Sequence, residues 1–370
     1  MSDINYPLIF GLLALVFSAL ISYVITPIVM LLAVKVKAID VPKDDRRMHS
    51  RAIPRLGGLA IFIAFCSGTL IFSDINIQIC GLLLGALVIV ALGFVDDIFA
   101  LSPWLKLLFQ IIASFIPILC GNVIEHISIF GRTIEFGVFS IPVTVLWIVG
   151  LTNAVNLIDG LDGLACGIAT IASVGILVLA IMKSEPQVAL LTAMLVGSCV
   201  GFLPFNVNPA KIFMGDTGAL MLGFVLSVIS IQGLFKTQAM VSFFVPFLIF
   251  ALPFIDTLVA IMRRLIHGQS PFHPDRGHLH HKLIDLGLSQ KQSVTILYAI
   301  SGILAIASVI FVVDPLKALV VIAIAIVFGL LNFRIFRKSS NVDNLDKMEH
   351  PDVADDIPVY MEKSNNSDEE

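Results

Sequence analysis

Long apolar runs alternate with short polar segments along most of the chain. Eleven of these runs have about the length that an α-helix needs to cross a bilayer, roughly 17 to 25 residues. Their predicted bounds are 7–34, 56–73, 78–95, 105–120, 139–155, 164–182, 187–205, 217–235, 239–262, 293–313 and 316–336. Because a helix satisfies its own backbone hydrogen bonds in lipid, this pattern predicts an all-α, polytopic helical membrane protein with about eleven transmembrane helices.

The amino-acid composition agrees with this prediction. Hydrophobic residues make up 58% of the 370 residues and charged residues only 14%, whereas soluble domains average about 25% charged residues. The lipid bilayer is therefore the first expected partner, and we expect no nucleic acid partner. The first run has no small-residue cleavage site behind it, so we expect it to stay as a helix.

Lysine and arginine set the predicted orientation. If the N-terminus is outside, nineteen of the 23 lysine and arginine residues fall on the inner side. Cytoplasmic loops of membrane proteins carry such an excess. The composition changes again near residue 339, where an acidic segment poor in apolar residues begins. We therefore predict an integral membrane domain, 1–338, and an acidic, disordered cytoplasmic tail, 339–370.

Polar residues concentrate in the segments on the predicted cytoplasmic side. These segments read VPKDDRRMHSRAIPRLGG, DDIFALSPWLK, NAVNLIDGLDG, NVNPAKIFMGDTG and RRLIHGQSPFHPDRGHLHHKLIDLGLSQKQ. The loops on the other side are mostly short and lack this pattern. This asymmetry predicts an active site that faces the cytoplasm. Because these segments all lie before residue 339, the catalytic domain is expected to be the membrane domain, 1–338.

The segment NAVNLIDGLDG places polar residues inside an apolar run. Asn153, Asn156 and Asp159 are each three residues apart and share one stripe of a helix, while Asp162 falls in the turn that Gly160 favours. Polar groups within a membrane span are usually paired or functional. The ordinary alternative, a helix end that simply meets water, is less favoured.

Asp216 and the histidines allow two interpretations each. Asp216 lies in GDTG at the start of an apolar run, where a carboxylate suits a metal that bridges to phosphate but also suits ordinary helix capping. The histidines of HLHH lack zinc-ligand spacing, so anion recognition fits them better than a zinc site. Asp256 needs a partner, and Arg263 lies two helical turns away; an ion pair and a substrate contact both remain open.

These segments, in this order, resemble a known family. GFVDDIFALSPWLK, NAVNLIDGLDGLA, FNVNPAKIFMGDTG, PFIDTLVAIMRR and HLHH resemble the polyprenyl-phosphate N-acetylhexosamine-1-phosphate transferases, most of all the bacterial undecaprenyl-phosphate GlcNAc-1-phosphate transferases. The resemblance implies a phosphotransferase of the bacterial inner membrane. It would move GlcNAc-1-phosphate from UDP-GlcNAc to undecaprenyl phosphate, release UMP and use Mg²⁺ or Mn²⁺, as the first membrane step of a cell-surface glycan.

The resemblance also implies roles for residues. Asp96 and Asp97 match a catalytic pair, and Asp216 and Asn156 match positions at the metal ion. The predicted substrate-binding residues are polar or cationic: Lys106, Asn153, Asp159, Asp162, Asn206, Lys211, Arg263, Arg264, His278, His280 and His281. Many relatives carry a third acid in a DDxxD pattern, where this chain has Ala100. The role of that acid is therefore absent or supplied elsewhere.

Other functions remain as alternatives. A related UDP-N-acetylhexosamine could replace UDP-GlcNAc, and a secondary transporter could also carry intramembrane charges. A transporter, however, needs polar residues along a path to both faces, and the outer side is nearly bare. The sequence leaves a homodimer open.

The charge asymmetry yields a test of orientation. Single cysteines placed at Ser50 and Gly268 should be labelled only from the cytoplasm, and one at Ser184 only from outside. An impermeant thiol reagent applied to intact cells and to inverted vesicles measures this. Reversed labelling would contradict the predicted side of the site.

Overall fold

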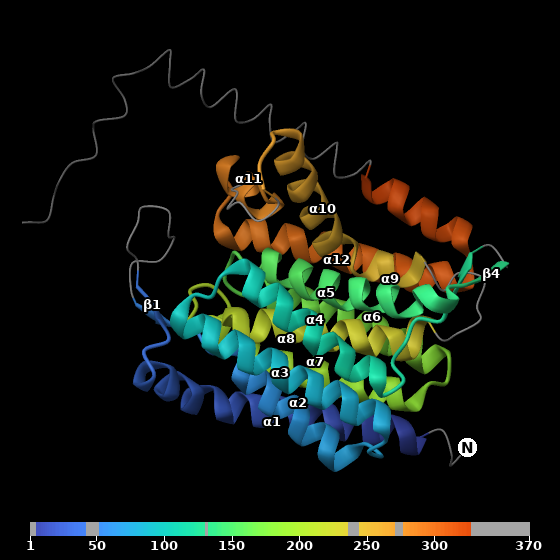
Figure 1. Ribbon diagram of the computed structural model, residues 1–370, viewed down its shortest axis with the longest axis horizontal. Coiled ribbons are helices and arrows are strands. Elements are labelled where there is room, and N and C mark those ends of the chain that lie inside the picture. The colour runs from blue at the N-terminus through green and yellow to red at the C-terminus, as the bar shows by residue number, and fades with distance from the viewer. Residues whose placement is uncertain (1–4, 42–51, 130–131, 236–243, 271–276, 327–370) are drawn as a thin grey trace, which may run out of the picture. The chain divides into compact units, whose positions relative to one another are not determined.

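The computed structural model describes residues 5–41, 52–129, 132–235, 244–270 and 277–326, and most of these residues are helical (Figure 1). The labelled helices are α1 Asn5–Lys35, α2 Gly58–Phe72, α3 Ile77–Phe99, α4 Pro103–Leu119, α5 Ser140–Ile158, α6 Leu164–Met182, α7 Pro186–Asn206, α8 Gly215–Ser230, α9 Phe244–Ile249, α10 Ala251–Ile266, α11 Leu279–Asp285 and α12 Gln290–Val313, and a further helix spans Pro315–Ile326. A 3-10 turn, Gly137–Phe139, precedes α5, and a π-helical turn, Ile231–Phe235, follows α8.

Two short antiparallel hairpins lie in the connections. Strand β1, Ile39–Asp40, pairs with β2, Ile53–Pro54, in the connection between α1 and α2. Strand β3, His126–Ile129, pairs with β4, Arg132–Glu135, between α4 and α5. The hairpins leave the helical character of the described chain unchanged.

The predicted class is confirmed. Among the described residues, seven helical stretches are long and apolar enough to cross a membrane: Ile9–Lys35, Ile77–Phe99, Gly137–Ile158, Leu164–Met182, Pro186–Asn206, Gly215–Gly233 and Gln290–Val313. Three shorter apolar helices are Gly58–Phe72, Pro103–Leu119 and Pro315–Ile326. The protein is thus an all-α, multi-pass membrane protein, whereas the count of eleven spans and the orientation stay predictions.

One expected span, 239–262, is divided in its described part. Helix α9 ends at Ile249 and α10 begins at Ala251. Pro253 has no N–H to donate to the carbonyl of Ile249, so the helical ladder is interrupted here. Helix α10 also buries the charged side chain of Asp256, unlike a helix that simply crosses lipid. The predicted boundary at 338 and the acidic tail lie outside the described residues.

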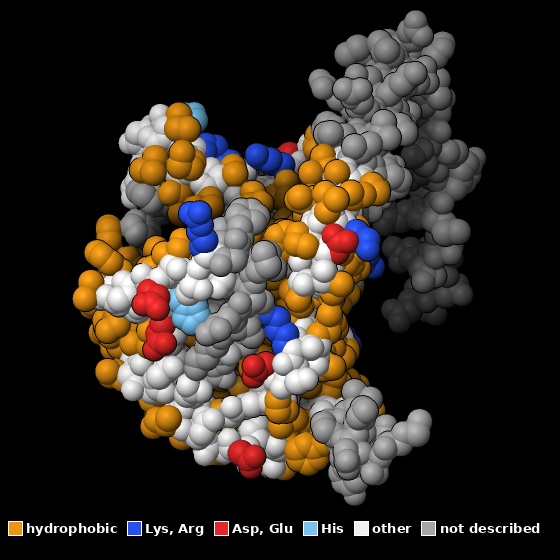
Figure 2. All heavy atoms as spheres, turned by 90° about the vertical axis from the view of Figure 1, so that its right-hand side faces the viewer, with side chains coloured by type: hydrophobic (Ala, Val, Ile, Leu, Met, Phe, Trp, Pro, Cys, Tyr) orange, Lys and Arg blue, Asp and Glu red, His pale blue; other side chains and the backbone are white. Residues whose placement is uncertain are grey.

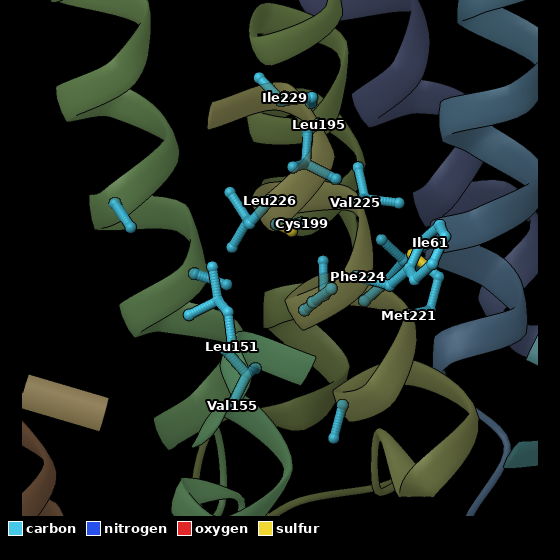
Figure 3. Packing of buried hydrophobic residues seen from close by; sticks show 14 of the residues in the cluster. Ile61, Leu151, Val155, Leu195, Cys199, Met221, Phe224, Val225, Leu226 and Ile229 are labelled. Atoms are coloured by element: carbon cyan, nitrogen blue, oxygen red, sulfur yellow. The ribbon is translucent and has the colours of Figure 1, made fainter. Parts of the chain in front are cut away.

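Helix α8 forms the axis of the core. Nearly all its residues are buried, and it packs against α2, α3, α5, α6 and α7. In Figure 3, Phe224 and Leu226 of α8 lie among side chains from the surrounding helices, including Leu151 of α5 and Leu195 of α7. A helix that is apolar on every side belongs inside a bundle. Helix α8 is therefore surrounded by the other helices of the bundle.

Hydrophobic side chains also cover the flanks of the bundle. Figure 2 shows one end of the molecule, where acidic and basic side chains are scattered and hydrophobic side chains dominate the flanks. On α1, for example, Ile28 and Leu31 are 61% and 74% exposed. Exposed apolar surface of this extent fits contact with lipid, because soluble proteins rarely expose large apolar patches.

Helices α1 and α7 approach each other closely through two glycines. A Cβ added to Gly197 would collide with the carbonyl oxygen of Leu15, and one added to Gly201 with that of Ala19. The two glycines are four residues apart and therefore lie on the same face of α7. Small residues at this spacing let membrane helices pack backbone to backbone.

This contact predicts that substitutions at two glycines change the stability of the protein differently. Gly201→Val should lower the free energy of unfolding by about 1 to 3 kcal/mol, because the added atoms meet backbone that cannot move aside. Gly11→Ala is the control, since nothing lies within 4 Å of a Cβ at that position. Unfolding of both variants in one detergent measures the difference, and equal stability would contradict the packing.

Candidate active site

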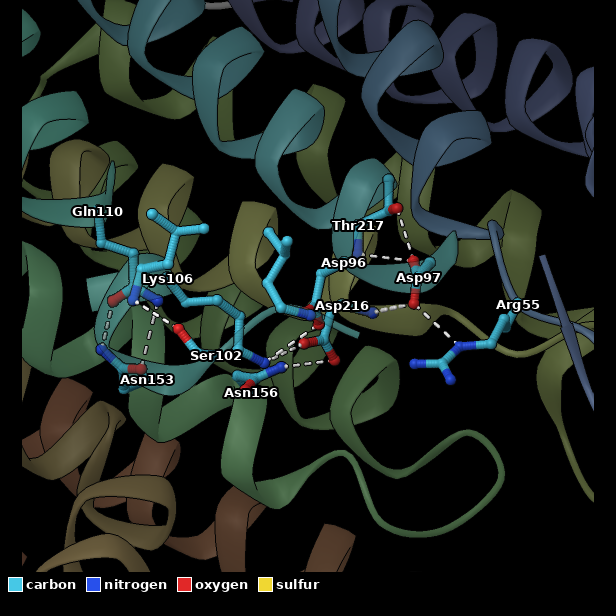
Figure 4. A network of polar contacts seen from close by, with 12 residues as sticks. Arg55, Asp96, Asp97, Ser102, Lys106, Gln110, Asn153, Asn156, Asp216 and Thr217 are labelled. Atoms are coloured by element: carbon cyan, nitrogen blue, oxygen red, sulfur yellow. Dashed lines mark hydrogen bonds and ion pairs between the residues drawn. The ribbon is translucent and has the colours of Figure 1, made fainter. Parts of the chain in front are cut away.

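The ends of four helices bring predicted site residues together (Figure 4). Asp96 and Asp97 lie in the last turn of α3, and Lys106 lies in the first turn of α4. Asn156 is near the end of α5, and Asp216 is near the start of α8. These four helix ends meet because neighbouring helices in the bundle run in opposite directions.

Lys106 links two carboxylates. Its Nζ lies 3.1 Å from Oδ2 of Asp96 and 2.8 Å from Oδ2 of Asp216. The connection between α3 and α4 makes this possible, because Ala100 adopts a left-handed conformation (φ 51°) and Ser102 caps α4 with its side chain. The chain thus reverses within a few residues. The result is a half-buried row of carboxylate, ammonium and carboxylate.

Two amide side chains of α5 support this row. Nδ2 of Asn156 donates a hydrogen bond of 3.1 Å to Oδ1 of Asp216. One turn earlier, Asn153 exchanges hydrogen bonds with Gln110 of α4, which is only 2% exposed. This buried amide pair joins α4 to α5 beside Lys106. The structure therefore places Asn153 in a contact between helices.

Asp97 caps the N-terminus of α8. Its Oδ1 accepts the backbone N–H of Asp216 (3.0 Å), and its Oδ2 accepts the backbone N–H of Thr217 (3.0 Å) and the Thr217 hydroxyl (2.7 Å). Nε of Arg55 donates to the same carboxylate at 3.0 Å. An anion is stabilised at this end of a helix because the first N–H groups have no partner within the helix.

Glycines allow the backbone to come this close. Gly215 has φ +71°, which disfavours other residues, and a Cβ there would collide with the carbonyl oxygen of Arg55 and with Asp97. Gly58 of α2 and Gly93 of α3 likewise lie against the first turn of α8. The glycines of the GDTG segment and its neighbours are thus required by space as well as by backbone conformation.

A cavity of about 980 Å³ opens beside Asp216. Its lining includes six residues that the sequence predicted: Asp159, Asp162, Asn206, Lys211, Asp216 and His281. Arg55 also lines it. Lys106 and Asn156 contact Asp216 and are one contact removed from the cavity. The volume falls in the range of pockets that hold a small ligand, roughly 300 to 1,000 Å³.

Two of the predicted binding residues hold loop structure. Oδ2 of Asp162 accepts hydrogen bonds from Nδ2 of Asn208 (2.9 Å) and from the backbone N–H of Ala210 (3.0 Å). Nδ2 of Asn206 donates to the carbonyl of Ile212 at 3.0 Å. Both side chains therefore shape the wall of the cavity, and Lys211 lies within the segment that they hold.

The three histidines of HLHH lie in different environments. Nδ1 of His278 lies 2.9 Å from Asp256, which also accepts the N–H of Leu279, so Asp256 pairs with this loop rather than with Arg263. His280 is 2% exposed and packs against Gly160. Burial, together with the charges of the neighbouring His281 and His278, lowers the pKa of His280 to about 4. Of the three, His281 lines the cavity.

The cations of α10 lie away from the cavity lining. Nη1 of Arg263 donates to the carbonyl of Gly277 at 2.9 Å, and Arg264 is 5% exposed. Neither is among the described residues that line the cavity. Arg263 thus holds Gly277, which lies just before α11. The predicted substrate contacts of Arg263 and Arg264 stay predictions.

The site has the chemistry that a divalent cation needs, although its acids are not gathered as a preformed cluster. No group of three or more His, Cys, Asp or Glu side chains in the described chain is arranged to hold a metal ion. Asp216 and Asn156 nevertheless offer carboxylate and amide oxygens, which Mg²⁺ prefers. Burial, together with the charges of Asp216 and Asp97, raises the pKa of Asp159 to about 8. Such crowding of acids is relieved by a cation.

Arg55, Gln110 and Thr217 were missed by the sequence reasoning. Arg55 and Gln110 contact partners 42 and 43 residues away along the chain. Arg55 stands in the polar segment VPKDDRRMHSRAIPRLGG, but nothing in that segment distinguishes it from the other cations, and Gln110 lies in an apolar run. Thr217 follows Asp216 in GDTG, and its hydroxyl could have been read as a second capping group. The contacts of Arg55 and Gln110 appear only once the chain has folded and the helices are packed.

Comparison with known proteins places the chain in a family. Residues 79–234 match the family described as glycosyl transferase family 4. The chain is 39% identical over 302 residues, 80% of its length and 84% of the relative, to a protein of Bacillus subtilis named "Probable undecaprenyl-phosphate N-acetylglucosaminyl 1-phosphate transferase". It is 33% identical over 348 residues, 85% of each chain, to "Decaprenyl-phosphate N-acetylglucosaminephosphotransferase" of Mycolicibacterium smegmatis.

A more distant relative has a different name. The chain is 35% identical over 211 residues, 51% of its length and 62% of the relative, to "Phospho-N-acetylmuramoyl-pentapeptide-transferase" of Streptococcus thermophilus. The matched region of the family covers α3 to α8 with their connections, and thus most of the site. The resemblance drawn from the sequence motifs is confirmed, and the chain belongs to glycosyl transferase family 4.

Proposed function

We propose that this protein transfers GlcNAc-1-phosphate from UDP-GlcNAc to undecaprenyl phosphate and releases UMP. The observation that carries the proposal is the row of Asp96, Lys106 and Asp216 where the four helix ends meet, with Asp216 lining the cavity. The names of the relatives support a polyprenyl phosphate and an N-acetylglucosamine phosphate. The uridine nucleotide is supported by the motif resemblance.

The two substrates approach from different sides in this proposal. Lys106 lies on the first turn of α4, where Trp104 and Leu108 are 67% and 52% exposed. An apolar polyprenyl chain can lie against such side chains while its phosphate reaches the Lys106 ammonium. The nucleotide sugar occupies the cavity beside Asp216. The charge asymmetry of the sequence supports a reaction on the cytoplasmic face of a bacterial inner membrane.

Asp96 is the base in the proposed mechanism. The second pKa of a phosphate ester is near 6, so a carboxylate suffices to accept the remaining proton of the lipid phosphate. An oxygen of that phosphate then attacks the β-phosphorus of UDP-GlcNAc. The bond from this phosphorus to the bridging oxygen breaks, and UMP leaves. Lys106 stays between Asp96 and Asp216 and offsets charge on both sides.

Asp216 and Asn156 hold a Mg²⁺ or Mn²⁺ ion in this proposal. When bound, the ion offsets the charge of the diphosphate and of the UMP leaving group. Asn156 orients Asp216 through its 3.1 Å hydrogen bond, and Asp97 fixes the backbone of Asp216. Lys211 adds a positive charge at the cavity wall.

The direct test is a reaction of purified protein with undecaprenyl phosphate, Mg²⁺ and a panel of UDP-sugars. Mass spectrometry of the lipid product should show GlcNAc joined through a diphosphate. A product with another N-acetylhexosamine would correct the donor and keep the reaction class. Absence of any lipid-linked sugar phosphate with every donor would contradict the proposal and favour a protein that moves, rather than transforms, its ligand.

Asp96→Asn should lower kcat by about 10² to 10⁴, because general-base removal typically costs that much. The variant should fold, since Asn can still accept the N–H of Leu101, which now donates to Asp96 at 2.7 Å. Asp74→Asn is the matched control, because Asp74 is exposed in the connection before α3. An Asp96→Asn enzyme as fast as this control would remove Asp96 from the mechanism.

Asp97→Asn should differ from Asp96→Asn by losing stability as well as activity. An amide presents one oxygen to the donors of Arg55, Asp216 and Thr217, so buried N–H groups lose partners. We expect a decrease of about 1 to 3 kcal/mol in the free energy of unfolding. Thermal or denaturant unfolding of the two variants measures this. Equal stability of the two would show that the cap of α8 is dispensable.

A further inference from the structure

Arg55 lies where the cavity meets the cap of α8. Its backbone N–H donates to the carbonyl of Ala38 at 3.0 Å, and the preceding residue, Pro54, accepts the N–H of Phe213 at 2.8 Å. The carbonyl oxygen of Arg55 also lies directly against Gly215. The backbone is therefore held on both sides, which fixes the point from which the side chain extends.

The guanidinium of Arg55 has two faces with different surroundings. Its Nε donates to Asp97, whose side chain is fully buried, while the Arg55 side chain remains 32% exposed. In Figure 4 the two terminal nitrogens point away from Asp97. Arg55 lines the cavity, so these nitrogens can reach a ligand there. One N–H out of five is used by Asp97, and a planar fork of donors remains.

The charge of the cavity requires such a group. Its described lining carries four aspartates: Asp40, Asp159, Asp162 and Asp216. The lining residues that carry a permanent positive charge, among those described, are Arg55 and Lys211. A ligand with two phosphates is repelled by the ionised acids, and these two cations are the groups of the described lining whose permanent charge attracts it. Arg55 is the one with two donors in a fixed plane, which matches two oxygens of a phosphate.

We propose that Arg55 binds the diphosphate of the nucleotide sugar through its terminal nitrogens while its Nε stays on Asp97. This inference rests on the proposed function and adds a substrate contact to it. Arg55 then joins the ligand to the carboxylate that caps α8 and so to the backbone of Asp216. The same side chain holds the donor substrate and the helix end that carries the reacting groups.

Arg55 could instead support only the fold, and its variants would then lose uridine and UDP binding in equal proportion. Measurements of ligand binding separate this structural role from a phosphate contact. Uridine, UMP and UDP share the nucleoside and differ only in phosphates. Binding of each to the purified full chain at constant Mg²⁺ can be measured by calorimetry. Arg55→Lys keeps a positive charge near Asp97 but loses the planar fork, and Arg55→Gln loses the charge. Arg132→Lys is the control, because Arg132 is exposed on β4.

We expect Arg55→Lys and Arg55→Gln to bind UDP about 10- to 100-fold more weakly than the parent, the usual cost of losing hydrogen bonds to a charged group. Their affinity for uridine should be unchanged, and Arg132→Lys should match the parent with all three ligands. In turnover assays, KM for UDP-GlcNAc should rise by a similar factor.

Two results would overturn the inference. If both variants bind UDP as the parent does, Arg55 makes no phosphate contact. If they lose uridine and UDP in equal proportion, or lose thermal stability so far that neither binds, Arg55 only supports the fold. The proposed function fails separately: a parent that binds UDP through Arg55 but forms no lipid-linked GlcNAc phosphate would keep this inference and lose the reaction.

Discussion

The carboxylate of Asp97 accepts the first N–H groups of α8, and the geometry of the site depends on this contact. Helix α8 is buried from Thr217 to Ser230, and its first N–H groups need partners that the helix itself does not supply. Asp97 supplies them from α3, and Arg55 balances the charge. Because Asp97 accepts the backbone N–H of Asp216, the contact that caps α8 also fixes the position of Asp216, the proposed metal-binding residue.

The other acids of the site are likewise held by cations and hydrogen-bond donors beside them. Buried carboxylates are costly unless cations or hydrogen-bond donors surround them. Lys106 lies between Asp96 and Asp216, and Asn156 donates to Asp216. In an apolar bundle these partners have few alternatives, so each helix end is positioned by its neighbour. A phosphate or a divalent ion that enters this arrangement finds charges already oriented, which is the condition for electrostatic catalysis.

Much of the fold and of the candidate site could be predicted from the sequence, because both depend on local patterns of apolar and polar residues. Long apolar runs predicted the helices, and the motifs around Asp96, Asn156 and Asp216 predicted the segments that meet. The partners of these residues could not be predicted, since Arg55 finds Asp97 and Gln110 finds Asn153 only through helix packing. The break between α9 and α10 within the predicted span 239–262 was missed because the high hydropathy of this segment was given more weight than Pro253. The HLHH motif looked uniform, yet burial gives its three rings different surroundings.

In the proposed reaction, the phosphorus next to the sugar moves with the sugar to the lipid. The most direct measurement uses UDP-GlcNAc radiolabelled at the β-phosphorus, with purified protein, undecaprenyl phosphate and Mg²⁺. The account predicts that the label appears in the lipid product and that unlabelled UMP is released. Label recovered in UDP, with the sugar alone transferred to the lipid, would contradict the attack on the β-phosphorus and the roles given to Asp96, Lys106 and Asp216.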